Sequence, residues 1–219
     1  ATAVKDIDGN VYNTVQIGDQ LWFAENLRTT HYNDGTAIQH VTDVATWSGL
    51  TTGARVYYDN DSTQYDTVYG ALYNWYAVET GKLCPAGWHV PTDEDWRGIL
   101  YNVNPWQGEP DEMQLGDTLK EAGFDHWNST DSLYINYQSY TITQSSATDA
   151  VGFTALPGGL RTVTGSFRGI KSSGYWWSST PINSDDSYWY RFLYDISSTF
   201  YRGSNYGKVG VSVRCIKDG

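Results

Sequence analysis

One aromatic-rich stretch, GYWWSSTPINSDDSYWYRF at positions 174–192, constrains the fold more than any other part of the chain. It belongs to a longer pattern. From about Ser132 onward, Val, Thr, Tyr, Phe and Trp alternate with small or polar residues, while Gly, Pro-Gly, Asn and Asp-Asp mark turns. Such alternation is typical of β-strands. We therefore expect an antiparallel sheet in which some of these rings face the core and others face outward.

The first half of the chain carries helix signals. Residues 69–80 (YGALYNWYAVET) have apolar side chains at helical spacing, and Gly81 can end the helix. Residues 89–100 (HVPTDEDWRGIL) are better marked, because Thr92 can cap a helix and Asp95 stands three positions later, as in a capping box. A third, shorter helix is predicted within residues 114–123 (QLGDTLKEAG), with Gly123 as its terminator.

Short strands are expected around these helices. Residues 4–27 contain the turn signals Asp8-Gly9 and Gly18-Asp19 between β-prone runs, which predicts a hairpin or meander. The polar stretch that follows is expected to be irregular to about Arg55, with one strand at residues 54–59 (ARVYYD).

The C-terminal segment, residues 208–218 (KVGVSVRCIKD), alternates and predicts a last strand with Val209, Val211, Val213 and Cys215 on one face. The predicted helices lie mainly in the first half of the chain and the predicted strands mainly in the second half. This order predicts the α+β class with an antiparallel sheet. A length of 219 residues suits one large domain, and no repeat or linker marks a boundary. We therefore interpret residues 1–219 as a single domain.

Charge and hydropathy limit the classes of binding partner that we expect. The chain holds 25 Asp and Glu against 14 Lys and Arg, a net charge of -11, and shows no basic stripe. Nucleic acids and anionic membranes are bound mainly through basic clusters, so neither is expected as a partner. No run approaches the roughly 20 apolar residues that span a bilayer. The chain opens at ATAVKDIDGN without a signal peptide or a starting Met, and we interpret it as a mature or excised segment.

The two cysteines, Cys84 and Cys215, lie far apart, and neither has a Cys or His neighbour at metal-ligand spacing. The chain is acidic and rich in Tyr, Asn, Ser and Thr, like many secreted proteins. A long-range disulfide is therefore favoured over two buried thiols.

Five motifs stand out along the chain: LYNWYAV (72–78), LCPAGWHVPTDEDW (83–96), TDAVGFTALPGG (148–159), GYWWSST (174–180) and VSVRCIKD (211–218). In content and order they resemble the Fibrobacter succinogenes major paralogous domain (FISUMP) family. That family occurs in secreted, cell-surface and lipid-anchored bacterial proteins. It is similar in turn to the C-type-lectin-like fold in its formylglycine-generating-enzyme variant.

The resemblance implies a C-type-lectin-like fold, in which twisted antiparallel sheets are flanked by two or three helices and the N- and C-terminal strands pair. It implies that Cys84 and Cys215 are bonded to each other. It also implies a secreted or cell-surface location, with other domains of a larger surface protein as an open alternative. The redox-active cysteine pair of a formylglycine-generating enzyme is not expected, because the two cysteines stand at structural positions.

The candidate binding residues follow from alternation. If residues 187–194 (SYWYRFLY) form a strand, Trp189 shares a face with Arg191 and Leu193, and the family resemblance places that face inward. Trp176 or Trp177 is expected inside as well. The opposite face would expose a contiguous patch of rings, which a soluble protein seldom shows without using it. The predicted ligand-binding residues are Tyr188, Tyr190, Phe192, Tyr194, Phe200, Tyr201, Arg202, Asn205 and Tyr206, of which Tyr190, Phe192, Tyr194, Arg202 and Tyr206 are expected to line one exposed surface. The alternative is that these rings cover the sheet beneath a loop or another domain.

Metal and catalytic signals are weaker. The calcium-binding triplets of C-type lectins do not occur in the sequence. A structural calcium ion at Asp59, Asn60 and Asp61 is kept as an alternative to a solvated turn, although the stretch lacks the Gly and Glu of an EF-hand loop. His89 is interpreted as a packed or capping histidine and not as a base. No serine lies in a nucleophile elbow, and no carboxylate pair stands out.

These features predict a non-catalytic extracellular domain that requires no cofactor and binds a surface glycan or a protein receptor through its aromatic face, in adhesion or nutrient capture. Two alternatives stay open. One is a carbohydrate-active enzyme or hydrolase with a carboxylate or His site, and the other is a structural domain of a larger surface protein.

Overall fold

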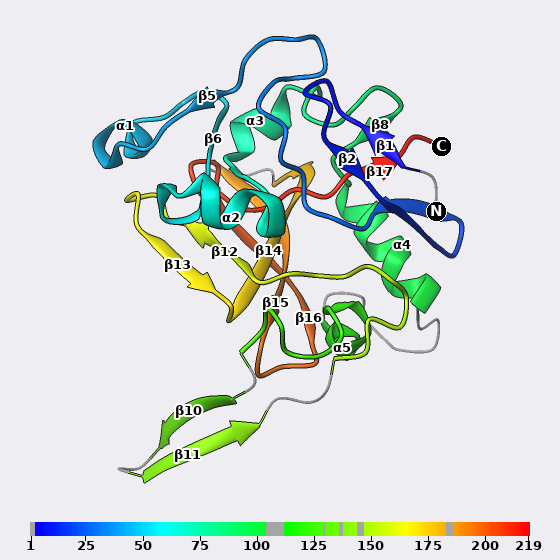
Figure 1. Ribbon diagram of the computed structural model, residues 1–219, viewed down its shortest axis with the longest axis vertical. Helices are drawn as coiled ribbons and strands as arrows, with labels where there is room; N and C mark the ends of the chain where they lie inside the picture. Colours follow the sequence, from blue (N-terminus) through cyan, green and yellow to red (C-terminus); the bar gives the residue numbers. More distant parts are fainter. Residues whose placement is uncertain (1–2, 104–111, 129, 136–137, 144–146, 183–185) are drawn as a thin grey trace.

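A computed structural model describes residues 3–103, 112–128, 130–135, 138–143, 147–182 and 186–219. Small sheets with short helices around them form the body, from which one hairpin extends away at the lower left (Figure 1). The helices are α1 (Val44–Ser48), α2 (Ser62–Tyr69), α3 (Trp75–Glu79), α4 (Asp93–Val103) and α5 (Gly116–Leu119), with a 3-10 turn, η1 (Tyr58–Asn60), before α2.

Two four-stranded sheets are the largest among the described residues. The first has the order β14 (Ser173–Pro181), β15 (Ser187–Tyr194), β16 (Phe200–Tyr206) and β9 (Glu112–Met113). The second has the order β3 (Thr14–Ile17), β4 (Gln20–Phe23), β17 (Ile216–Lys217) and β8 (Trp88–His89).

The smaller sheets pair β1 (Val4–Lys5) with β2 (Val11–Tyr12), β10 (Thr130–Ile135) with β11 (Gln138–Thr143) and β12 (Gly158–Arg161) with β13 (Phe167–Ile170), and join β5 (Gln39–His40), β6 (Ala54–Val56) and β7 (Leu72–Tyr73). The β10–β11 pair is the hairpin that leaves the body in Figure 1. Strand pairing is antiparallel throughout the described residues except between β5 and β6. The predicted α+β class is confirmed.

The end of the chain returns to its beginning. Ile216 of β17 pairs with Trp22 of β4, so a C-terminal strand lies beside an N-terminal one as expected. The predicted strand over residues 208–218 is much shorter, however. Residues 209–214 are buried and form only isolated bridges, including Tyr73 with Val211 and Trp176 with Ser212. This segment therefore threads between elements and does not follow one neighbouring strand.

The core is built around tryptophans on both faces of β14. Trp176 and Trp177 are adjacent and point to opposite faces, yet both are fully buried. The indole Nε1 of Trp176 donates to Asn26 Oδ1 over 2.9 Å, and that of Trp177 donates to the Tyr73 carbonyl over 2.8 Å. Because each buried indole nitrogen has an acceptor, both rings stabilise the fold without an unpaired donor.

Helix α4 begins as its sequence predicts. The Thr92 Oγ1 accepts from the Asp95 amide over 3.1 Å, and Asp95 Oδ2 accepts from the Thr92 amide over 2.8 Å, which is a reciprocal capping box. The stripe Trp96, Ile99 and Leu100 is fully buried. In Figure 1 this helix lies beside the β3–β4–β17 sheet.

The other helix predictions need correction. The helix predicted over residues 69–80 is only α3, because Leu72 and Tyr73 form β7 against β6 and Asn74 caps the helix at Ala77. The third helix is the single turn α5. Helix α1 lies where irregular chain was expected, and α2 lies in a stretch for which no helix was predicted. Each contains only one buried residue and so shows no apolar stripe in the sequence.

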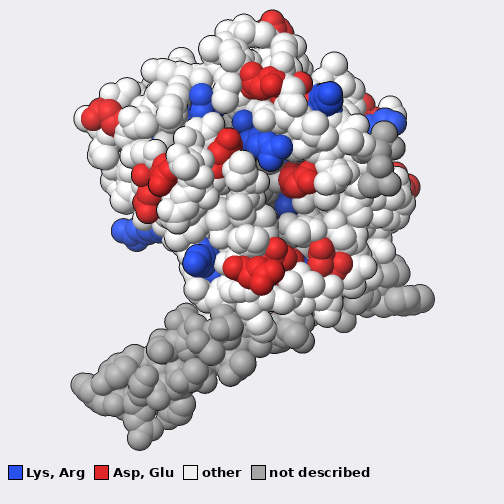
Figure 2. Space-filling view, viewed as in Figure 1, with Lys and Arg blue, Asp and Glu red and all other residues white. Residues whose placement is uncertain are grey.

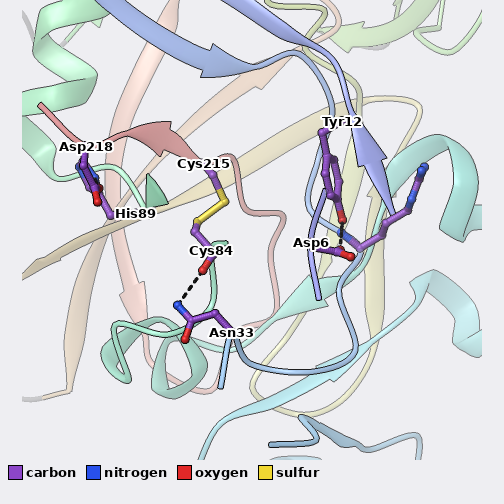
Figure 3. The surroundings of a disulfide bond; sticks show 8 residues. Asp6, Tyr12, Asn33, Cys84, His89, Cys215 and Asp218 are labelled. Carbon is purple, nitrogen blue, oxygen red and sulfur yellow. Dashed lines mark hydrogen bonds and ion pairs between the residues drawn. A yellow bond between two sulfur atoms is a disulfide. The ribbon is translucent and has the colours of Figure 1, made fainter. Parts of the chain in front are cut away.

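The predicted disulfide is confirmed. The sulfur atoms of Cys84 and Cys215 lie 2.04 Å apart, and the bond joins the segment before β8 to the residue before β17 (Figure 3). The Asn33 side-chain nitrogen Nδ2 donates to the Cys84 carbonyl over 3.0 Å. Both cysteines are buried in the cluster that contains Trp177 and Val213. The bond therefore lies inside the packed core.

Candidate functional site

The outer face of the β14–β15–β16 sheet carries a cluster of rings. We call Tyr175, Tyr190, Phe192, Tyr194 and Tyr201 the aromatic face. Phe192 is at its centre, with its ring centroid 4.9 Å from that of Tyr201 and 5.3 Å from those of Tyr190 and Tyr194. Tyr175 completes the cluster from β14, 5.8 Å from Phe192. Tyr194 is exposed and the other four rings are half-buried, with Tyr175 and Tyr190 also packed against the core cluster, so the face is partly accessible.

Register explains this face. Phe192 pairs with Tyr175 on β14 and with Tyr201 on β16, and paired residues of antiparallel strands point to the same side. Tyr175 was not among the predicted site residues, because the motif that contains it, GYWWSST, was used only to place Trp176 or Trp177 inside. Trp176 and Trp177 are fully buried, whereas Tyr175 is half-buried. Alternation of side chains along β14, the same pattern that was used for β15, could have identified Tyr175 as a residue on the face opposite Trp176.

Tyr188 lies at the end of the face. Its ring stacks on Trp75 with a centroid distance of 3.5 Å and an angle of 13° between the planes. The neighbouring Tyr76 hydroxyl donates to the Asp186 carboxylate over 3.0 Å. Tyr188 is thus held against α3 and is less available to a ligand than the five rings of the aromatic face.

Two predicted site residues lie on the opposite face. Phe200 is fully buried, and its ring centroid lies 5.9 Å from that of Trp96. Arg202 pairs with Arg191, and its guanidinium lies 3.5 Å from the ring centroid of Trp189. The expectation that Phe200 and Arg202 lie beside the outward rings is therefore wrong.

Asp93 explains why Arg202 turns inward. The Asp93 carboxylate, at the start of α4, accepts from Arg202 Nη2 over 2.8 Å and from Arg191 Nη2 over 3.1 Å. Arg191 is fully buried and Asp93 almost so. The burial of Leu193 and Arg191 and the half-burial of Trp189 agree with the predicted inward face of β15.

A hollow of about 340 Å³ adjoins the aromatic face. We call it the Tyr175 hollow. It lies between the β12–β13 hairpin and the β14–β16 sheet and is lined by Leu160, Thr162, Val163, Arg168, Tyr175, Asn205, Tyr206 and Val209. Asn205 and Tyr206 were predicted site residues, and Tyr206 is 56% exposed at the rim. The β12–β13 contribution could not be predicted, because no local signal shows which hairpin covers the sheet.

Two phenols, Tyr175 at this hollow and Tyr190 on the aromatic face, remain protonated. Burial raises the pKa of Tyr175 well above its ordinary value. Burial and the nearby Tyr194 raise the pKa of Tyr190, while a hydrogen bond with Asn205 opposes this rise. Neutral hydroxyls can both donate to and accept from a polar ligand.

A second hollow, of about 410 Å³, lies beside β17 and is lined in part by His89, Asp95 and Asp218. His89 Nδ1 lies 2.7 Å from Asp218 Oδ1, and His89 Nε2 lies 3.2 Å from Asp95 Oδ2. His89 is therefore neither packed in the core nor a direct cap; it is attached to the Asp95 of the capping box. Among the described residues that line this hollow, there is no serine, threonine or cysteine that could act as a nucleophile.

The calcium candidates lie in the turn before α2. Asp59 and Asn60 have positive φ angles of 49° and 59°, and Asp61 caps α2 by accepting from the Gln64 amide over 3.1 Å. Among the residues that the structure describes, no group of three His, Cys, Asp or Glu could hold a metal ion. Asp61 thus has a structural role, and a calcium ion at this turn stays a prediction.

Within the described residues, no helix is long and apolar enough to cross a membrane.

The comparisons with known proteins identify the family. The family model described as the Fibrobacter succinogenes major domain matches residues 15–217, and the chain belongs to this family. Neither the curated proteins nor the solved structures contained a match.

Proposed function

We propose that this protein is a non-catalytic extracellular domain that binds a surface glycan or a protein receptor through the aromatic face and the adjoining Tyr175 hollow. The observation that carries the proposal is the contact of five rings on one accessible sheet face beside a hollow. Exposed rings offer apolar surface at low entropic cost, since tyrosine has few rotatable bonds. Adhesion or nutrient capture is the role that such binding would serve.

The proposal includes a C-type-lectin-like fold and a secreted or cell-surface location. The pairing of β17 with β4 supports the first, since paired terminal strands are what that fold requires. The disulfide supports the second, because such bonds persist in oxidising compartments. No cofactor is part of the proposal.

A hydrolase centred on His89 is the second candidate, because this imidazole lies in a hollow between two carboxylates. Both of its ring nitrogens already lie within hydrogen-bond distance of carboxylate oxygens, however, so each has a partner within the protein. Turnover of glycosides or esters that is lost in His89→Gln would favour this candidate over the binding domain.

The binding proposal is tested by alanine substitution of exposed rings. Tyr194 and Tyr206 are 39% and 56% exposed, so their removal is expected to leave the melting temperature unchanged. A ligand is first selected on a glycan array or by capture of a purified receptor, and binding is then titrated. Tyr194→Ala and Tyr206→Ala should each weaken binding roughly tenfold or more.

Tyr101→Ala is the matched control, because Tyr101 is 47% exposed on α4 and lies outside both the aromatic face and the Tyr175 hollow. If Tyr194→Ala and Tyr206→Ala bind like the wild type, the proposed face is wrong. If they instead unfold at lower temperature, the rings serve a structural role.

A further inference from the structure

We propose that the Tyr175 hollow binds the carboxylate of an acidic saccharide, with Arg168 as the residue that recognises it. The inference rests on the proposed function, because it names the ligand class of the same site.

Strand register places Arg168 at the hollow. Arg168 of β13 pairs with Leu160 of β12, so both side chains lie on the same face of the hairpin. Both also line the hollow. Leu160 is half-buried against the core cluster, whereas Arg168 is exposed. Leu160 thus forms part of the wall, and the guanidinium is available at the rim.

The charge of the hollow favours an anionic ligand. Arg168 is the one charged residue among the described residues that line the hollow. None of the ion pairs between described residues involves Arg168. The chain holds 14 Lys and Arg against 25 Asp and Glu, and Figure 2 shows basic and acidic groups interspersed over the face it presents. Since a guanidinium binds a carboxylate with two parallel hydrogen bonds, an anionic ligand group fits this position.

The second hollow gives a contrast within the same molecule. It is lined by Asp19, Asp95 and Asp218, with Lys217 and His89 among them. An anion in the second hollow would be repelled by three carboxylates. In the Tyr175 hollow, the one charged group among the described lining residues is the guanidinium of Arg168, which would attract it. Of these two hollows, the Tyr175 hollow is therefore the one whose charge favours an acidic ligand.

Shape and the remaining lining favour a saccharide. A volume of about 340 Å³ lies within the range of small-ligand pockets, whereas protein partners bury broader and flatter surfaces. Tyr175 and Tyr206 offer ring faces for the C–H surface of a sugar, and the Asn205 side-chain amide offers polar contacts. A sugar ring that carries a carboxylate uses all of these groups together.

The experiment compares a short oligogalacturonate with its methyl-esterified form, which has the same rings without the charge. Binding of both is titrated at low and high salt against the wild type, Arg168→Gln, Arg168→Lys and Tyr206→Ala. Lys5→Gln serves as the control, because Lys5 is an exposed cation on β1 outside the hollow.

We expect the wild type to bind the acid roughly tenfold or more tightly than the ester, and salt to reduce this preference. Arg168→Gln should abolish the preference and leave ester binding unchanged. Arg168→Lys should keep part of it, since lysine retains the charge and loses the planar fork. Lys5→Gln should behave like the wild type.

Equal binding of acid and ester by the wild type would overturn the inference. If Tyr206→Ala then weakened both, the proposed binding function would still stand. Binding of an acidic peptide in place of either saccharide would also overturn the inference. If no ligand bound and no substitution on the aromatic face had an effect, the proposed function itself would fail.

Discussion

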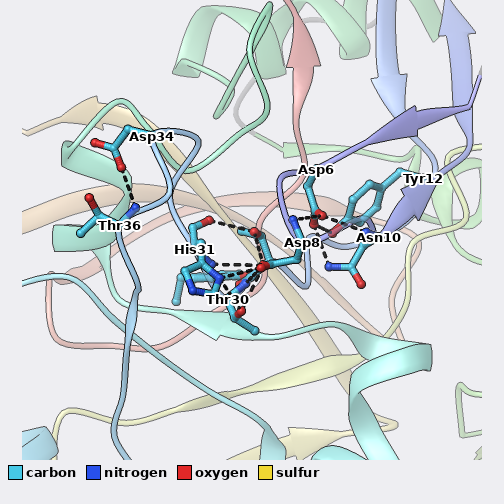
Figure 4. Close-up of polar contacts among 10 residues, drawn as sticks. Asp6, Asp8, Asn10, Tyr12, Thr30, His31, Asp34 and Thr36 are labelled. Carbon is cyan, nitrogen blue, oxygen red and sulfur yellow. Dashed lines mark hydrogen bonds and ion pairs between the residues drawn. The ribbon is translucent and has the colours of Figure 1, made fainter.

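Asp8 shows how one carboxylate can join two separate loops. Its Oδ2 accepts from the Thr30 amide over 2.6 Å and from the Thr29 hydroxyl over 2.9 Å, and its Oδ1 lies 2.6 Å from His31 Nδ1 (Figure 4). Burial alone would raise the pKa of Asp8. The hydrogen bonds from Thr30, His31 and Thr29 outweigh that effect and lower the pKa to about 2.

The lowered pKa predicts an acid-sensitive contribution to stability. The folded-state pKa of about 2 lies below the ordinary value of 3.8, so the ionised carboxylate stabilises the fold above about pH 4. This contribution is lost as the pH falls from about 4 to about 2. Urea unfolding over that range should show a smaller loss of stability in Asp8→Asn than in the wild type.

Glu94→Gln is the control for this prediction, because the Glu94 side chain is 82% exposed. It should follow the wild-type pH profile. An Asp8→Asn variant that loses as much stability as the wild type on acidification would show that the contacts of Asp8 do not depend on its charge.

At the scale of elements, what the sequence predicts depends on how local the signal is. The capping box of α4 spans four residues, and alternation along β15 needs only that strand, so both were predictable. The face of β16 was not. It depends on the register in which Arg191 meets Arg202, and the turn between β15 and β16 sets that register. Arg168 was missed for a related reason, since only tertiary packing brings the β12–β13 hairpin to the sheet.

The attachment of α4 to the β15–β16 pair can be tested at Asp93. Asp93→Asn keeps the shape of the side chain but removes the negative charge that Asp93 presents to Arg191 and Arg202. Because Arg191 is fully buried, the free energy of unfolding is expected to fall by about 2 to 4 kcal/mol. Chemical denaturation measures this change. The neighbouring Glu94→Gln, which is exposed, should change it by less than about 0.5 kcal/mol. Equal stability of the two variants would show that the ion pairs do not hold the helix to the sheet.

At the scale of the whole molecule, the two ends of the chain are fixed to one core. Trp22 near the start of the chain pairs with Ile216, and Cys215 beside it is bonded to Cys84. Figure 1 accordingly shows both termini on the same side of the body. A buried polar contact also joins the two ends of the chain. Arg214 is fully buried, and its Nη1 donates to the Phe23 carbonyl over 3.1 Å. The C-terminal segment thus connects sheets that local sequence signals cannot place relative to one another.

The disulfide should therefore contribute to the stability of the entire domain. Its cysteines are 131 positions apart, and a cross-link that closes a loop of this length restricts the unfolded chain by about 4 to 5 kcal/mol in the chain-entropy description. Replacing Cys84 and Cys215 by alanine should lower the free energy of unfolding by about this amount, and reductant should have a comparable effect on the wild type. Reductant should leave the double variant unchanged, which separates loss of the cross-link from loss of sulfur packing. If the reduced wild type unfolds at the same denaturant concentration as the oxidised protein, packing around β17 alone holds the C-terminal segment in place.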